Sequence, residues 1–132
     1  MKEKYRLPIK LLLEMLKEVE IEGPCGKVKV LALIDTGATA QMISEDVYRT
    51  VCLENESTGI IIPASGEPMV TKSGFVEMKV EGCPKKKVLT YVGPFNLIGM
   101  EYLSDSKAVI DTETGEMVCK VIKEKAKELS ED

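Results

Sequence analysis

Histidine is absent from all 132 residues of this chain. Its absence removes the Ser-His-Asp and Cys-His nucleophile systems, zinc sites of the His-Glu-x-x-His type and histidine proton shuttles. Among hydrolytic chemistries, the composition therefore favours one that depends on carboxylates alone.

Aromatic residues and positive charge are also scarce. Aromatics make up 5% of the chain, the net charge is -4 and the pI is near 5.1. The longest basic run is Lys85-Lys86-Lys87, so we expect no nucleic-acid partner. No apolar run approaches the ~18 residues of a membrane span, and Lys10 and Glu14 interrupt the N-terminal apolar stretch, which does not fit a signal peptide. We expect a cytoplasmic protein with no membrane partner.

Cysteine pairs of the Cys-x-x-Cys type are missing as well. The cysteines lie singly at Cys25, Cys52, Cys83 and Cys119, which gives little support to a zinc ribbon or a thioredoxin-like centre. We interpret them as buried free thiols. Only two Asn and one Gln stand beside abundant Lys and Glu, which hints at a thermophilic source. In such an organism disulfides could not be excluded by compartment alone.

The most informative segment that is present is Leu31-Ala32-Leu33-Ile34-Asp35-Thr36-Gly37-Ala38-Thr39-Ala40. An apolar run leads one carboxylate into a turn of small residues, where burying it is costly unless it is used or paired. The alternative is an Asx-type turn that closes a strand, in which Asp-Thr-Gly serves only the backbone. Asp35 is therefore a candidate catalytic acid.

This segment resembles the active-site loop of retroviral-type aspartic proteases, the retropepsins. In the family pattern two apolar residues precede Asp-Thr-Gly-Ala and an apolar segment follows it; here these are Leu33-Ile34 and Met42-Ile43. A second block, from Val92 to Leu103, contains the apolar-apolar-Gly element Leu97-Ile98-Gly99. The resemblance spans roughly Leu16 to Leu103. It implies an all-β, retropepsin-like fold with pseudo-symmetric hairpin and ψ-loop halves, a flap hairpin and a short helix after Gly99.

Aspartic-protease chemistry needs two carboxylates that share one proton. The chain carries a single Asp-Thr-Gly and is one domain long, so we predict a homodimer in which Asp35 from each subunit activates a water for peptide-bond hydrolysis. Thr36 can hydrogen-bond across the two-fold axis, and Gly37 lets the backbone turn beside the substrate. No metal or organic cofactor is implied, and the partners are a second copy and a polypeptide substrate.

Substrate-binding residues are assigned more indirectly. We expect Ala38 to line the cleft beside the catalytic loop, and the flap to be the hairpin of residues 59–70. The flap tip is then Ala64, Ser65 and Gly66, although a plain surface hairpin is the alternative. Apolar pockets are assigned to Phe95 and Leu97 by the resemblance and to Met42 by its position after the loop. Core packing is the commoner role for such side chains.

The chain is predicted to be a single domain over residues 1–132, with a core at about 16–103. Residues 18–22 and 27–34 form a first hairpin, and similar residues recur at 76–84 and 88–89, which suggests an internal repeat. A C-terminal hairpin joins 108–111 to 117–121, and a charged helix follows over 123–132. Residues 7–16 are expected to be extended.

Some features depart from the viral pattern. Acidic residues that follow Asp-Thr-Gly-Ala in many viral relatives, and an arginine after the late glycine, are replaced here by Thr39 and Met100. This indicates a different scheme of subunit contacts. Asp111, in Ile110-Asp111-Thr112, superficially echoes the first site but is expected to be a turn residue. Two further hypotheses are a catalytically silent module for dimerisation or polypeptide binding, and a latent enzyme released by trimming of its termini.

Overall fold

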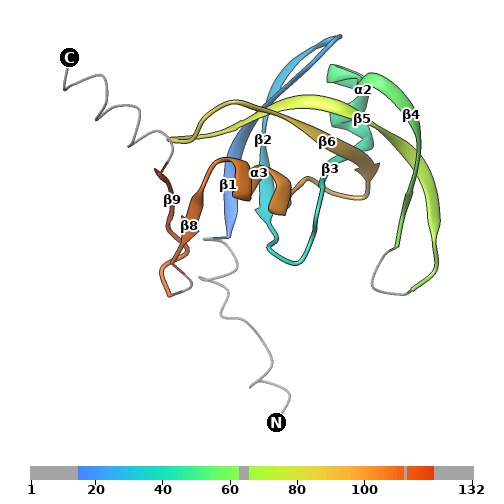
Figure 1. The fold of residues 1–132 in the computed structure, drawn as a ribbon. Coiled ribbons are helices and arrows are strands. Elements are labelled where there is room, and N and C mark those ends of the chain that lie inside the picture. The colour runs from blue at the N-terminus through green and yellow to red at the C-terminus, as the bar shows by residue number, and fades with distance from the viewer. Residues whose placement is uncertain (1–14, 63–65, 112, 121–132) are drawn as a thin grey trace.

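The computed structural model describes residues 15–62, 66–111 and 113–120. Predictions for the extended segment 7–14, for Ala64 and Ser65 in the flap and for the helix over 123–132 lie outside these residues. The described elements are, in chain order, β1 (Leu16–Gly23), β2 (Gly26–Ile34), β3 (Gln41–Ser44), α2 (Glu45–Val51), β4 (Glu54–Ile61), β5 (Met69–Val80), β6 (Lys86–Gly93), β7 (Leu97–Ile98), α3 (Met100–Asp105), β8 (Ala108–Ile110) and β9 (Met117–Cys119) (Figure 1).

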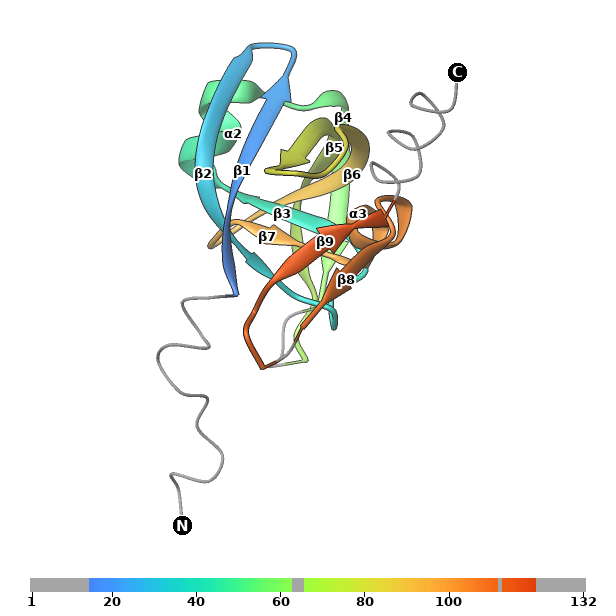
Figure 2. The same ribbon diagram turned by 90° about the vertical axis from the view of Figure 1, so that its left-hand side faces the viewer.

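Seven strands form one sheet in the order β1-β2-β7-β3-β6-β5-β4. An additional pairing of β1 with β5 closes six of them into a ring, and β4 extends outward from β5. The pairs β2–β7 and β3–β6 are parallel, whereas β1–β2, β4–β5 and β5–β6 are antiparallel. Figure 2 shows the strands wrapping round a common interior. The all-β, retropepsin-like fold class is confirmed.

The first hairpin forms as its residue pattern predicts. Val19 and Ile21 alternate with charged residues along β1 and are fully buried, because successive side chains of a strand point to opposite faces. Val19 lies opposite Val30 of β2. The turn from Gly23 to Gly26 packs so closely on the end of α2 that a Cβ on Gly23 would lie 2.3 Å from the Val51 carbonyl oxygen.

The suggested internal repeat corresponds to two similar halves. The β1–β2 hairpin and the β5–β6 hairpin meet where Val19 lies opposite Val80. In each half the chain continues into a short helix, α2 in the first and α3 in the second. The first half supplies the loop with Asp35, and the second half supplies the strand and helix that support this loop.

The interior is mainly apolar, and the hydroxyl of a buried tyrosine within it makes two hydrogen bonds. Val19, Ile21, Ile43, Met78 and Ile98 belong to the core. Tyr102 of α3 is fully buried; its hydroxyl donates to the Pro84 carbonyl at 2.8 Å and accepts from the Val80 amide at 3.0 Å. Burial raises the pKa of Tyr102, so the phenol stays neutral. These bonds fix α3 against the turn between β5 and β6.

The interpretation of the cysteines as free thiols is wrong. Cys25 is bonded to Cys52, and Cys83 is bonded to Cys119. The partners are 27 and 36 residues apart in sequence, so no local motif signals the pairing, and only the fold brings them within bonding distance. One bridge fastens the β1–β2 turn to the end of α2, and the other fastens β9 to the turn after β5.

We expect the Cys83–Cys119 bridge to contribute strongly to stability. Replacing both residues with Ala should lower the free energy of unfolding by about 2–4 kcal/mol, because the bridge closes a loop of 36 residues in the unfolded chain. Chemical denaturation without reductant measures this difference. In reductant the variant and the wild type should become nearly equal, and an equally large difference there would show that packing, not the covalent link, is responsible.

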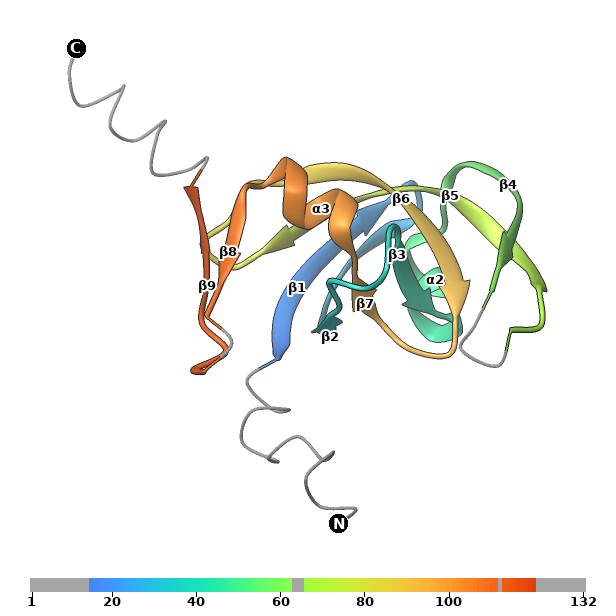
Figure 3. The same ribbon diagram turned by 60° about the horizontal axis from the view of Figure 1, so that its bottom comes forward.

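The C-terminal hairpin is confirmed as a separate two-stranded sheet. Val109 of β8 lies opposite Val118 of β9. Both side chains are substantially exposed, at 48% and 39%. Figure 3 shows α3 next to this hairpin and close to β7. Helix α3 thus lies between the added hairpin and the closed sheet.

Candidate active site

Asp35 stands on a loop at the open end of β2. Its amide donates to the Ile98 carbonyl of β7 at 2.9 Å, and its carbonyl accepts from the Ala38 amide at 3.2 Å. The Gly37 amide donates to Asp35 Oδ1 at 2.8 Å. The carboxylate is therefore oriented by the backbone of its own loop, and the loop is held by the second half of the molecule.

The Asp35-Thr36-Gly37 triplet lies at the surface of the chain. Asp35 is half-buried, while Thr36 and Gly37 are exposed. A Cβ on Gly37 would lie 3.2 Å from Asp35 Oδ1, so a larger residue there would crowd the carboxylate. A partly exposed carboxylate fixed in this way is open to a partner or a substrate.

Helix α3 is hydrogen-bonded directly to the backbone of the Asp35 loop. The Met100 amide donates to the Ala38 carbonyl at 2.7 Å, and the Glu101 amide donates to the Thr39 carbonyl at 2.9 Å. A Cβ on Gly99 would lie 2.2 Å from the Ala40 carbonyl oxygen. The glycine of Leu97-Ile98-Gly99 is thus explained by the close approach of the Asp35 loop.

The predicted pocket residues lie near this loop but differ in exposure. Met42 of β3 and Leu97 of β7 are paired neighbours, and Leu97 is 5% exposed. Met42 also packs over Gly93, where a Cβ would lie 2.2 Å from its sulfur. Phe95, in the connection between β6 and β7, is 49% exposed. The structure therefore brings Met42 and Leu97 together and leaves Phe95 at the surface.

The arms of the predicted flap are the β4–β5 hairpin. Ile60 lies opposite Val70, and both side chains are exposed. Gly66, the tip residue that the structure describes, has a φ of 86°, a left-handed conformation that glycine adopts readily. The arms of the hairpin are confirmed; the role of the tip as a substrate cover stays a prediction.

Asp111 is a turn residue, as expected. Its Oδ1 accepts from the Glu113 amide at 2.9 Å, and its carbonyl accepts from the Gly115 amide at 2.7 Å. These bonds close the connection between β8 and β9. The similarity of Ile110-Asp111-Thr112 to the Asp35 segment is therefore explained by the role of Asp111 in a turn.

We expect Asp111→Asn to leave activity and fold nearly unchanged, because an amide oxygen can accept the same backbone hydrogen bonds. Turnover of a cleaved peptide and the midpoint of thermal unfolding check this. A loss as deep as that expected for Asp35→Asn would move the catalytic pair into one chain.

A groove of about 490 Å³ opens beside the Asp35 loop. It lies between Thr36, helix α3 and strand β8, and its lining is mainly apolar. The residues are Met15, Thr36, Met100, Leu103, Ser104, Lys107, Ala108 and Ile110. Met100, at the position where viral relatives carry arginine, is 40% exposed here. The face that carries Asp35 is thus bordered by apolar surface.

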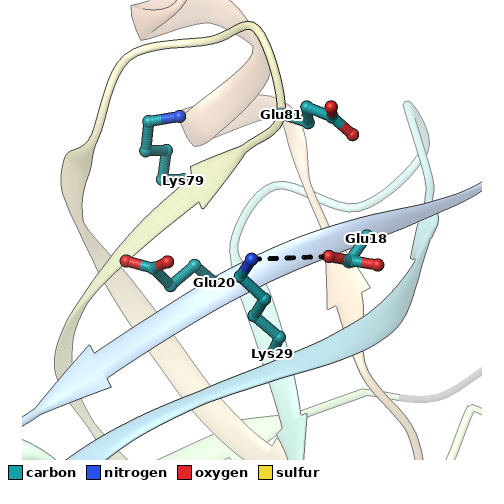
Figure 4. Close-up of a pocket in the computed structure, with 5 residues that line it drawn as sticks. All are labelled: Glu18, Glu20, Lys29, Lys79 and Glu81. Carbon is teal, nitrogen blue, oxygen red and sulfur yellow. Dashed lines mark ion pairs between the residues drawn. The ribbon is translucent and has the colours of Figure 1, made fainter.

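A second hollow, of about 190 Å³, is lined only by charged side chains. Figure 4 shows Lys29 reaching between Glu18 and Glu20, with Lys79 and Glu81 on the neighbouring segment. Lys29 Nζ lies 3.8 Å from Glu18 Oε1. Such exposed pairs contribute little to stability. We interpret this hollow as the solvated outer face of β1, β2 and β5.

Sequence reasoning missed Gln41, which is buried directly after the catalytic loop and contacts helix α3. The available signal was its position: it is the single Gln of the chain and stands immediately before the apolar pair Met42-Ile43. A polar side chain at the start of a buried strand requires hydrogen-bond partners.

A closed β sheet that presents Asp-Thr-Gly on a loop, above an apolar-apolar-Gly strand and a short helix, defines the retropepsin-like class of aspartic protease folds. The family model of the gag-polyprotein putative aspartyl protease matches residues 18–105, two thirds of the chain. The chain belongs to this family. No curated protein matches it at a significant level. The β8–β9 hairpin lies beyond the matched residues.

Proposed function

We propose that the protein is an aspartic endopeptidase that works as a homodimer, with one Asp35 from each subunit. The observation that carries this proposal is the Asp35 loop itself: one half-buried carboxylate, oriented by the Gly37 amide, on a loop whose backbone is hydrogen-bonded to β7 and α3. Family membership supports protease-like chemistry. A single carboxylate cannot act as acid and base at once, which is the reason for the second copy.

The proposed reaction needs the two carboxylates to share one proton. The ionised Asp35 takes a proton from a water, whose oxygen attacks the scissile carbonyl carbon, while the protonated Asp35 of the other subunit gives its proton to the carbonyl oxygen. In the collapse of the tetrahedral intermediate, the carboxyl that took the water proton gives it to the leaving nitrogen as the C–N bond breaks. The other carboxylate takes a proton from a hydroxyl of the intermediate, which restores a pair that shares one proton. Thr36 stabilises the loop pair across the axis, and Gly37 orients the carboxylate.

The surface around the loop supports a second copy as the partner. Thr36 lies in the apolar groove with Met100 and Leu103, and the groove continues to Ile110 of β8. Burial of this surface would favour association by removing apolar area from water. Many viral relatives have an acidic residue and an arginine at two positions that hold Thr39 and Met100 in this chain. Apolar contacts would replace that charged pair here.

An extended polypeptide is the proposed substrate. A bound strand presents alternate side chains to opposite walls of a cleft. Ile60 and Val70 on the flap arms offer apolar surface. Met42, Leu97 and Phe95 are the proposed pocket residues, and Ala38, Ala64, Ser65 and Gly66 the proposed backbone contacts. Apolar residues on both sides of the cleaved bond are therefore expected.

The test is mass spectrometry of a diverse peptide library incubated with the wild type across about pH 4 to 8. Cuts flanked by apolar residues, absent with Asp35→Asn, would establish the activity and report the pockets. Absence of cuts from a folded dimer would instead support the silent module or a form that awaits trimming. Digestion with a second protease that removes the termini, followed by the same library, separates those two outcomes.

The cytoplasm is the proposed location. Within the described residues, no helix has the length and apolar character needed to cross a membrane. The two disulfides are typical of oxidising compartments, although intracellular proteins of hyperthermophiles are also rich in them. A cytoplasmic location for a protein with two disulfides is therefore consistent only with the thermophilic source that the composition suggests.

A further inference from the structure

Gln41 is a buried side chain whose hydrogen bonds reach two other elements, β6 and α3. It begins β3, directly after the catalytic loop, and is 1% exposed. Its Nε2 donates to the Leu89 carbonyl of β6 at 2.8 Å and to Glu101 Oε1 of α3 at 3.1 Å. Its Oε1 accepts from the Gly99 amide at 3.3 Å and the Tyr102 amide at 3.1 Å. The amide group is thus fully used.

These contacts complete the N-terminus of α3. The first amides of a helix have no partner within the helix, and Gly99, the N-cap residue, has no side chain to supply one. The Gly99 and Tyr102 amides bind Gln41 Oε1, while the Met100 and Glu101 amides bind the carbonyls of residues 38 and 39. The start of α3 is therefore capped entirely by residues 38–41.

Glu101 holds Gln41 in this orientation. Its Oε1 accepts from Gln41 Nε2 and also from the Leu89 amide, at 2.8 Å. The carboxylate thus anchors α3 to β6 and fixes which end of the Gln41 amide faces the helix. Rotation of the Gln41 side chain would take the acceptor away from the Gly99 and Tyr102 amides at the start of α3. The same helix terminus binds the carbonyls of the Asp35 loop.

We infer that Gln41, held by Glu101, is a positioning residue that sets the place of the Asp35 loop against α3. This inference rests on the proposed function, because the loop matters for catalysis only if Asp35 is catalytic. Gln41 acts through the carbonyls of Ala38 and Thr39, which it helps to keep on the Met100 and Glu101 amides. Displacement of a catalytic group by about 1 Å can cost a hundredfold in rate.

The test is Gln41→Glu, which keeps the side-chain shape and the acceptor for Gly99 and Tyr102. The new carboxyl group carries at most one hydrogen where Nε2 carries two, so the Leu89 carbonyl and Glu101 Oε1 cannot both keep a donor. In its ionised form the new carboxylate also repels Glu101. We expect kcat to fall at least about tenfold, with KM changed less than about threefold. Amide hydrogen exchange at Met100 and Tyr102 should become at least about tenfold faster. Asn55→Asp, the same chemical change at an exposed position on β4, is the matched control and should alter neither quantity.

A second pair of variants gives the answer if Gln41→Glu does not fold. Glu101→Ala removes the acceptor that holds Gln41 and should also speed exchange and lower kcat, whereas Glu101→Gln keeps an acceptor oxygen and should recover most of both. The inference is overturned if folded Gln41→Glu, or Glu101→Ala, has the same kcat and the same hydrogen-exchange rates as the wild type. If the wild type cleaves no peptide, the proposed function fails, and exchange alone decides: faster exchange in the variants supports the positioning role, and unchanged exchange overturns it.

Discussion

Replacing Asp35 with Asn is expected to remove peptide-bond cleavage almost completely, with a fall in kcat on the order of 10³-fold or more. An amide cannot take a proton from water or pass one to the scissile carbonyl. The fold should survive, because the Asn Oδ1 can still accept from the Gly37 amide as Asp35 Oδ1 does now. Cleavage of a peptide from the library, with thermal unfolding as the check on folding, measures both effects.

Mixing the wild type with Asp35→Asn tests whether the two carboxylates come from two chains. In a homodimer with a shared site, every mixed dimer lacks one carboxylate and is inactive, so activity falls as about the square of the wild-type fraction. Activity that falls only in proportion to this fraction would place the whole catalytic pair in one chain. Full activity of the pure variant would remove Asp35 from the mechanism altogether.

The sequence predicted the elements whose signals are local. Alternating apolar residues identified β1 and β2, and small residues after an apolar run identified the Asp35 loop. Leu97-Ile98-Gly99 identified the short helix that follows Gly99. The turn role of Asp111 also follows from a local preference. Each of these features is decided by residues within one or two elements, so a pattern in the sequence is sufficient to find it.

Features that join distant segments could not be read in the same way. The bond between Cys83 and Cys119 depends on how the C-terminal hairpin returns to the β5–β6 turn, and cysteine spacing alone does not encode that return. Gln41 and Glu101 are 60 residues apart, and their contact exists only because β3 and α3 pack together. Both misses concern long-range pairing: the bridge joins the C-terminal hairpin to the β5–β6 turn, and the Gln41–Glu101 bond joins β3 to α3.

Gly99→Ala is expected to be the most damaging single-methyl change at the support of the loop. The new Cβ would lie 2.2 Å from the Ala40 carbonyl oxygen and 2.9 Å from the Ala38 carbonyl oxygen. Both atoms belong to the backbone, so no side chain can rotate to make room. We expect the free energy of unfolding to fall by about 3 kcal/mol or more. Cleavage should be lost as well, because any relief must move the Asp35 loop away from α3. Chemical denaturation and peptide turnover measure these losses.

Gly82→Ala is the matched control. A glycine can be required because other atoms approach too closely for a Cβ or because its φ is positive, and Gly82 has the second cause where Gly99 has the first. Gly99 has a φ of -105°, which any residue adopts, so its cost comes from close approach alone. Gly82 has a φ of 78° with no atom near a new Cβ, so its cost of about 1–2 kcal/mol comes from backbone conformation alone. Activity should survive in Gly82→Ala. Equal stability losses in the two variants, or full activity in Gly99→Ala, would show that the contact of α3 with residues 38–40 does not hold the catalytic loop in place.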